Sequence, residues 1–336
     1  MNIAFPARSG PTAAKLDTMK AAVLTGPGSV RVEEVPVPAP GPGEVRVRLA
    51  GCGVCASNLG PWAGPDWMRF PTAPGDLGHE GWGEIDAIGA GVEGLKPGDP
   101  VTALFYRSYA QYDVGPADAV VKLPPSLAGR PFPGEPLGCA INIMKRSDIR
   151  AGQFVAIVGA GFLGALLTRL ASDAGARVIA ISRRPFALDV VRRLGATEVV
   201  AMDDHRRIVE RVKEITGGEL CDRVIEATGK QWPLDLAAEL VRERGRLVIA
   251  GYHQDGPRQV NMQLWNWRGI DVINAHERDA NVYIQGMREA IDAVAAGRID
   301  PAPLFTHVYP LERLGEALDA TRDRPDGFLK ALVVMR

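Results

Sequence analysis

The chain has 336 residues, 46% of them apolar, and a formal net charge of −1 at pH 7. A chain of this length can bury a sizeable core and predicts two domains. The near-zero charge and the lack of an apolar run of about 18 residues argue against a nucleic-acid partner and against a membrane span. Four cysteines make no disulfide framework, which favours a cytoplasmic protein.

Residues 1–18 lack the apolar segment of a signal peptide and are interpreted as a flexible leader. From residue 19 to about 142, short β-like runs such as "KAAVLTG", "EVRVRLAG" and "DPVTAL" alternate with Gly- and Pro-rich turns. Several short strands between such turns predict an all-β barrel or sandwich unit.

From about residue 150 the pattern changes to apolar strands that alternate with amphipathic helices, as in "QFVAIVGA" followed by "LGALLTRLASDAG". This alternation predicts an α/β domain with a doubly wound parallel sheet over residues 143–278. The tail, 279–336, contains further helices and a last apolar strand, "KALVVM". We expect the tail to fold back on the first domain, which would then comprise residues 19–142 and 279–336.

A glycine-rich turn follows the first strand of this α/β domain, with Gly159, Gly161 and Gly164 in G-x-G-x-x-G register. In this motif the first glycine permits a tight turn and the second lets the backbone approach a pyrophosphate. The third lets the following helix pack closely on the strand. The sequence therefore predicts a dinucleotide site that includes the intervening Phe162 and Leu163.

The next strand, "RVIAIS", ends at Ser182, where an NAD enzyme usually carries an acidic residue. Arg183 and Arg184 follow it. A hydroxyl and guanidinium groups can bind a 2′-phosphate that a carboxylate would repel. This run predicts NADP(H) in preference to NAD(H). The alternative is that both arginines are ordinary solvated charges at a helix start.

The stretch "GCGVCASNL" contains Cys52 and Cys55 with the spacing C-x-x-C, which is compatible with a redox pair or with a metal site. His79 follows in "GDLGHEGWGEI", and "PGEPLGCAINIMKR" contains Glu135 and Cys139. One thiolate, one imidazole and one further Cys or Glu, far apart in sequence, form no compact zinc finger. They favour a catalytic zinc centre with an open position.

Together these motifs resemble the medium-chain dehydrogenase/reductase superfamily, specifically its zinc-dependent alcohol, sorbitol and threonine dehydrogenases. The resemblance extends from Met19 onward and rests on "MKAAVL", "G-V-C-x-S", "GHE-x-x-G", "GAGFLG" and "THVYPLERLGEAL". It implies a GroES-like, β-rich catalytic domain and a Rossmann cofactor domain. It also implies one catalytic zinc, a small alcohol or ketone substrate, and a homodimer or homotetramer.

Transferred residue by residue, the resemblance implies that Cys55 and His79 are zinc ligands and that Glu80 is the neighbouring acid. For the third ligand it favours Glu135 of the "E-P-L" motif, with Cys139 as the alternative.

The resemblance also makes Ser57 the group that accepts the proton of the alcohol, but two neighbours depart from the family pattern. Asn58 stands where the family has an Asp that orients the ligand histidine, although an amide oxygen can still accept the imidazole N–H. Gly60 replaces a histidine that passes the proton to solvent. The segment 103–120 contains no cysteine, so we expect no structural zinc.

Several further residues have two interpretations. His253 and His276 each follow a predicted strand, where they would either contact cofactor or substrate or lie on the surface. Cys52 is expected to pack behind the metal site and Cys221 in a core. The candidates for a substrate pocket, or else for core or interface packing, are Trp62, Trp67 and Trp265.

The predicted reaction is the reversible oxidation of a secondary alcohol, such as a polyol, cyclitol or sugar derivative, to a ketone, with hydride transfer to NADP(H) or NAD(H). One alternative is a zinc-free quinone or enoyl reductase of the same fold, against which Cys55, His79 and Glu135 argue. The other is a catalytically silent dinucleotide-binding protein, with which Asn58 and Gly60 are compatible.

Overall fold

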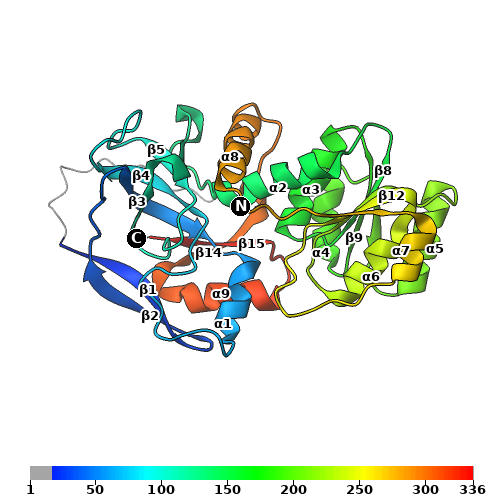
Figure 1. The fold of residues 1–336 in the computed structure, drawn as a ribbon, viewed down its shortest axis with the longest axis horizontal. Coiled ribbons are helices and arrows are strands. Elements are labelled where there is room, and N and C mark those ends of the chain that lie inside the picture. The colour runs from blue at the N-terminus through cyan, green and yellow to red at the C-terminus, as the bar shows by residue number, and fades with distance from the viewer. Residues whose placement is uncertain (1–16, 336) are drawn as a thin grey trace. The chain divides into compact units, whose positions relative to one another are not determined.

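The computed structural model describes residues 17–335, which form two compact units (Figure 1). The second unit is Cys139–Tyr283, and the first unit contains the chain before and after it. The expected leader falls, up to residue 16, outside the described residues, and the expected domain boundaries stay predictions. Within residues 17–335, no helix has both the length and the apolar character needed to cross a membrane.

A mixed β-sheet forms the framework of the first unit. Its strand order is β14 (Phe305–Pro310), β15 (Lys330–Val334), β3 (Glu44–Gly53), β4 (Gly81–Ile88), β5 (Pro100–Ala103) and β7 (Val120–Lys122). β6 (Tyr112–Pro116) also pairs with β3, and β1 (Thr18–Gly26) forms an antiparallel hairpin with β2 (Ser29–Pro36). Because β15 pairs antiparallel with β3, the C-terminal tail completes the sheet that the N-terminal part begins.

The core of the first unit is formed by buried apolar side chains of this sheet and of the helices that pack on it. Along β3, Val45, Val47 and Leu49 are buried while the residues between them are more exposed, as expected for a strand with one face on a core. Two helices add to the same core, α1 (Leu59–Ala63) through Trp62 and α9 (Leu314–Asp323) through its apolar face. Two longer helices, α2 (Gly134–Ser147) and α8 (Ala280–Ala295), contain the points at which the chain leaves and re-enters this unit.

The second unit is an open parallel sheet with helices between its strands. The strand order is β10 (Glu198–Ala201), β9 (Arg177–Ser182), β8 (Phe154–Val158), β11 (Cys221–Glu226), β12 (Val241–Ile249) and β13 (Asp271–Asn274). The order reverses between β8 and β11, which is where such sheets bind ligands. The helices are α3 (Phe162–Asp173), α4 (Pro185–Arg193), α5 (His205–Thr216), α6 (Gln231–Leu240) and α7 (Met262–Arg268).

Both faces of this sheet are covered. Alternate residues of β8 and β9, among them Ala156 and Ile179, share one core with the apolar sides of α5 and α6. α3 and α4 contact each other and β9 (Figure 1), and the side chains on the opposite face of the strands are also fully buried. The central strands β8 and β9 are therefore mostly apolar, as expected for parallel strands between two helix layers. These features confirm the predicted fold class, a β-rich GroES-like domain with a doubly wound Rossmann domain.

Candidate functional site

The three glycines of the turn after β8 have three different environments. Gly159 has a φ of +109°, a conformation that L side chains rarely adopt. A Cβ at Gly164 would overlap the carbonyl oxygen of Gly159, so α3 packs directly on the turn. A Cβ at Gly161 would meet no atom within 4 Å, which leaves open space at the N-terminus of α3. The turn thus combines a tight bend, close helix packing and an open backbone face that fits a pyrophosphate.

The end of β9 offers a hydroxyl and guanidinium groups. Ser182 is buried, and its Oγ accepts a hydrogen bond from the backbone N–H of Arg184 at 3.4 Å. Arg183 is exposed, and Arg184 directly precedes α4. Residues 182–184 contain no carboxylate, so nothing in this run would repel a 2′-phosphate.

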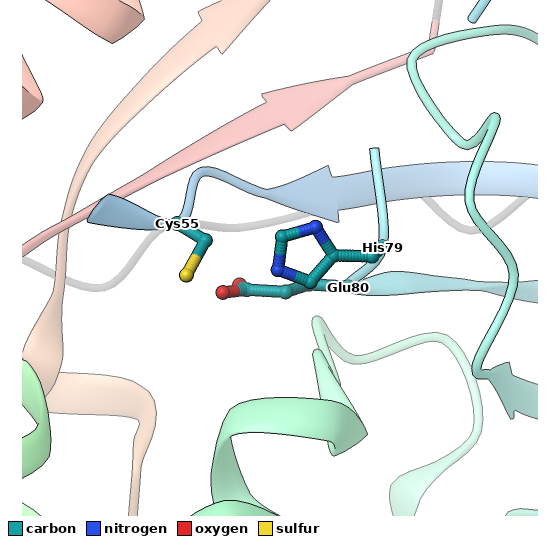
Figure 2. A group of neighbouring side chains, drawn as sticks. All are labelled: Cys55, His79 and Glu80. Atoms are coloured by element: carbon teal, nitrogen blue, oxygen red, sulfur yellow. The ribbon is translucent and has the colours of Figure 1, made fainter. Parts of the chain in front are cut away.

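Cys55, His79 and Glu80 come together in the first unit, and Figure 2 shows their side chains pointing toward one another. One ligand atom of each residue lies within 4.8 Å of the other two. Cys55 precedes the 3₁₀ turn Ala56–Asn58, and its Sγ accepts the backbone N–H of Ser57 at 3.5 Å. A thiolate, an imidazole and a carboxylate are donor types that bind Zn²⁺ in proteins.

A backbone carbonyl orients the imidazole of His79. Its Nδ1 lies 2.8 Å from the carbonyl oxygen of Leu77, which can only accept, so Nδ1–H donates and Nε2 is left for a ligand. Burial lowers the pKa of His79, but a hydrogen bond to Cys55 and the negative charges of Cys55, Glu135 and Glu80 outweigh it and raise the pKa to about 10. The site therefore attracts positive charge, which a metal ion can supply in place of the proton.

The structure contradicts the expectation that the amide oxygen of Asn58 accepts the imidazole N–H. Its Oδ1 instead accepts the hydroxyl of buried Tyr109 at 2.8 Å, and its Nδ2 donates to the carbonyl oxygen of Leu77 at 3.1 Å. The Leu77 carbonyl thus receives hydrogen bonds from both Asn58 and His79. An amide can donate to this carbonyl where an Asp carboxylate would repel it, so Asn58 acts on His79 through the backbone.

Glu80 is fully buried and forms an ion pair with a residue of the C-terminal tail. Its Oε1 accepts a hydrogen bond from Nζ of Lys330 at 2.6 Å. Burial lowers the pKa of Lys330, but the charges of Glu80, Cys55 and Glu135 and the hydrogen bond to Glu80 raise it above its usual value. This pair keeps a buried charge on Glu80 compensated.

The second carboxylate oxygen of Glu80 fits a cation. Oε2 is buried and has no hydrogen-bond partner among residues 17–335, an arrangement that costs free energy unless a positive group lies against it. Gly53 gives this carboxylate its space, because a Cβ there would overlap Oε2. The orphaned oxygen, the Cys–His–Glu donor set and the raised pKa of His79 are all compatible with a zinc ion.

Glu135 lies in the first turn of α2 and is buried. Its charge raises the pKa values of His79 and Lys330, so it is near the cluster, but it is not one of the three residues that converge. The ligand role expected for Glu135, with its alternative Cys139, stays a prediction, and the geometry adds Glu80 as a further candidate. The proton-accepting role of Ser57 likewise stays a prediction.

Most of the remaining candidates lie in cores. Cys52 and Cys221 are fully buried as expected, and burial raises the pKa of Cys52 well above its usual value and that of Cys221 to about 12. All the cysteines lie within the described residues, and none of them forms a disulfide there. Trp62 belongs to the core of the first unit and Trp265 packs against that of the second, whereas Trp67 is 70% exposed.

The two histidines expected near the cofactor are tied to backbone and side chains of the second unit. Nε2 of His253 lies 3.1 Å from Oε2 of Glu226, and Nε2 of His276 lies 3.2 Å from the carbonyl oxygen of Gly251. Contact with cofactor or substrate stays a prediction for both.

Two residues of the site were not predicted from the sequence: Lys330, which pairs with Glu80, and Tyr109, which donates to Asn58. A lysine that opens an otherwise apolar strand, "KALVVM", is a signal for a buried ion pair, although it does not identify the partner. Tyr109 lies in "RSYAQY" and carries no comparable signal.

Two family models match the chain. The alcohol dehydrogenase GroES-like domain matches residues 41–125, and the zinc-binding dehydrogenase domain matches residues 163–295. The chain is 27% identical to a sorbitol dehydrogenase of Bacillus subtilis, over 94% of this chain and 97% of the relative. It is 28% identical to an alcohol dehydrogenase of Geobacillus stearothermophilus, over 90% of this chain and 95% of the relative.

Among solved structures, a Sinorhizobium meliloti 1021 protein bound to NADP superposes with a TM-score of 0.82. It is 25% identical, over 95% of this chain and all of the neighbour. The chain belongs to the zinc-type medium-chain dehydrogenase superfamily, as the two family matches and the relatives show. The fold and the glycine turn agree with this assignment. Such relatives support an NAD(P)-linked dehydrogenase that acts on a small-molecule alcohol.

Proposed function

We propose that this protein is a zinc-dependent dehydrogenase that oxidises a secondary alcohol of the polyol, cyclitol or sugar class, reversibly, with NADP(H) or NAD(H). The observation that carries the proposal is the convergence of Cys55, His79 and Glu80 within 4.8 Å in a chain that also has an open dinucleotide turn. The similarity to the sorbitol dehydrogenase of Bacillus subtilis supports a substrate with a secondary hydroxyl.

Cys55 and His79 would hold the zinc ion, with a carboxylate from Glu80 or Glu135 as the third ligand. When bound, zinc supplies a Lewis acid that stabilises negative charge on the substrate oxygen. Three protein ligands leave a position open for that oxygen. Lys330 pairs with Glu80 and would hold its carboxylate in place, and the carbonyl of Leu77 would keep His79 in the tautomer whose Nε2 can bind.

Ser57 would accept the proton of the substrate hydroxyl at its Oγ. It lies in the 3₁₀ turn Ala56–Asn58, two residues after Cys55. Without a histidine at Gly60, the proton would pass from Ser57 to solvent through water. The turn Gly159–Gly164 would bind the pyrophosphate through backbone N–H groups and so orient the nicotinamide for hydride transfer.

For the cofactor we propose NADP(H) over NAD(H), because Ser182 and the arginines after it suit a 2′-phosphate. Ser182→Asp should reverse the preference, since the new carboxylate would repel the 2′-phosphate and bind the ribose hydroxyls. Dissociation constants of NADPH and NADH for both proteins measure this directly. A preference that Ser182→Asp leaves unchanged would contradict the assignment.

The proposed function is tested by activity on a panel of polyols, cyclitols and the corresponding ketones, with each dinucleotide, before and after removal of bound metal. We expect turnover that is lost with the metal and restored by zinc. Turnover of quinones or enoyl substrates by metal-free protein would indicate a zinc-free reductase instead. Dinucleotide binding without turnover of any substrate would indicate a catalytically silent protein.

A further inference from the structure

The turns that follow β11 and β12 approach each other closely. A Cβ at Gly251 would overlap the backbone nitrogen of Gly229 and the carboxylate of Glu226. Gly229 itself has a φ of +73°, and a Cβ there would overlap the carbonyl oxygen of Tyr252. Both turns lie at the carboxyl ends of neighbouring parallel strands, on one side of the point where the strand order reverses. They therefore border the crevice in which such a sheet binds its ligand.

Glu226, the last residue of β11, fastens both turns and is fully buried. Its Oε1 accepts the backbone N–H groups of Thr228 at 2.6 Å and Gly229 at 2.9 Å, in the turn after β11. Its own carbonyl oxygen accepts the N–H groups of Ala250 at 2.9 Å and Gly251 at 2.8 Å, in the turn after β12.

His253 makes a second connection between the same turns. Nε of Arg258 donates to Nδ1 of His253 at 2.8 Å, and since a guanidinium can only donate, Nδ1 carries no proton. The proton is therefore on Nε2, which donates to Oε2 of Glu226 at 3.1 Å. Arg258 also donates to the carbonyl oxygen of Gly229 at 2.8 Å. Both ring nitrogens of His253 are thus occupied within the protein.

We propose that Glu226, His253 and Arg258 form a positioning network that holds these two turns in the conformation that receives the nicotinamide half of the dinucleotide. The inference rests on the proposed function, because it requires a nicotinamide dinucleotide in this crevice. The strands β8 and β9, with the glycine turn and Ser182, face the adenosine half, so β11 and β12 face the other half. In this proposal His253 acts through the turns, because both of its ring nitrogens already have hydrogen-bond partners within the protein.

The test compares each reduced dinucleotide with the matching ADP-ribose fragment, which lacks only the nicotinamide, by calorimetric titration of the full chain. Glu226→Gln keeps the size of the side chain but sets an amide donor against either the His253 N–H or the two backbone N–H groups. We expect the dinucleotide to bind about tenfold more weakly to this variant. The fragment should bind as tightly as to the unchanged protein.

Two substitutions of His253 distinguish the effect of its hydrogen bonds from the effect of its size. They also provide the test if Glu226→Gln does not fold. His253→Gln keeps one donor and one acceptor and should bind the dinucleotide nearly as well as the unchanged protein. His253→Phe keeps the bulk, loses both groups and should behave like Glu226→Gln. Arg206→Ala, on the exposed side of α5, is the control that should change neither affinity.

An equal loss of affinity for dinucleotide and fragment would overturn the proposal, since it would indicate general damage to the second unit. Dinucleotide binding to His253→Phe at the unchanged affinity would also overturn it. If the unchanged protein binds neither dinucleotide, the proposed function fails and the network proposal fails with it.

Discussion

The dinucleotide turn of the second unit and the candidate metal site of the first unit are built in different ways. The turn is one short run, Gly159–Gly164, whose shape depends on backbone conformation and on missing side chains. The metal site combines side chains from distant parts of the chain, and buried partners such as Lys330 hold them. The glycine turn is therefore sensitive to added side-chain atoms, and the candidate metal site is sensitive to the loss of a hydrogen-bond or ion-pair partner.

The largest effect is expected from Lys330→Met, which leaves the charge of Glu80 buried and unpaired. Breaking a buried ion pair from one side should lower the free energy of unfolding of the metal-free protein by about 3–5 kcal/mol. Lys20→Met breaks the exposed pair with Glu312 and should leave the stability nearly unchanged. Urea denaturation measures both, and equal effects of the two variants would contradict the role given to Lys330.

Asp113, on β6, is a second buried carboxylate of the first unit, and its effect on stability can be measured through its titration. Burial raises its pKa from 3.8 to about 6, against the hydrogen bonds from Ser108, Arg107 and Val114. The native state therefore binds the proton more tightly than the unfolded state. The stability that this proton contributes is present below pH 3.8 and is lost as the pH rises through 6.

Asp113→Asn removes this titration and serves as the reference. As the pH rises from 4 to 7, the stability advantage of the unchanged protein over Asp113→Asn should shrink by about 3 kcal/mol. Urea denaturation of both proteins across this range measures the difference. A stability difference that stays constant with pH would show that Asp113 titrates normally.

Two alanine substitutions in the glycine turn separate binding from folding. Gly161→Ala adds a methyl group in open space, so the fold should persist while dinucleotide affinity falls about 100-fold, because the Cβ stands where the pyrophosphate approaches. Gly164→Ala overlaps the carbonyl oxygen of Gly159 and should lower thermal stability as well. Thermal unfolding and dinucleotide titration distinguish the two, and unchanged binding by Gly161→Ala would place the pyrophosphate elsewhere.

The smallest effect is expected from Tyr109→Phe, which removes only the hydroxyl that holds Asn58. Because Asn58 supports the carbonyl that orients His79, zinc affinity should fall about tenfold. Tyr309→Phe, elsewhere in the first unit, is the matched control. Competition with a fluorescent chelator measures zinc affinity. Identical affinities of the two variants would show that Asn58 has no role in positioning His79.

The same contrast explains what could be predicted from the sequence. The strand–helix alternation and the glycine register are local patterns, so the fold of the second unit and its turn followed from them. The short strands of the first unit were predicted as well, since turn residues separate them. Helix α2 was not predicted. Its sequence was interpreted only as a possible ligand motif around Glu135, within a region expected to be rich in strands.

The partners in the metal site could not be predicted, because they depend on tertiary contacts between distant segments. Lys330 lies 250 positions from Glu80. The direct contact expected between Asn58 and His79 was wrong, since Leu77, with a φ of +72°, places its carbonyl between their donors. Such backbone conformations at non-glycine residues have no reliable sequence signal.

The central claim, that this dehydrogenase depends on one zinc ion held by Cys55 and His79, is tested most directly by titrating metal-free protein with zinc and following turnover of the best substrate of the panel. We expect turnover to rise from background and to stop rising at about one zinc per chain. Cys55→Ala should retain its fold and gain no turnover at any zinc concentration. Full turnover of the metal-free protein, or full turnover by Cys55→Ala, would show that the activity does not depend on a zinc ion at Cys55.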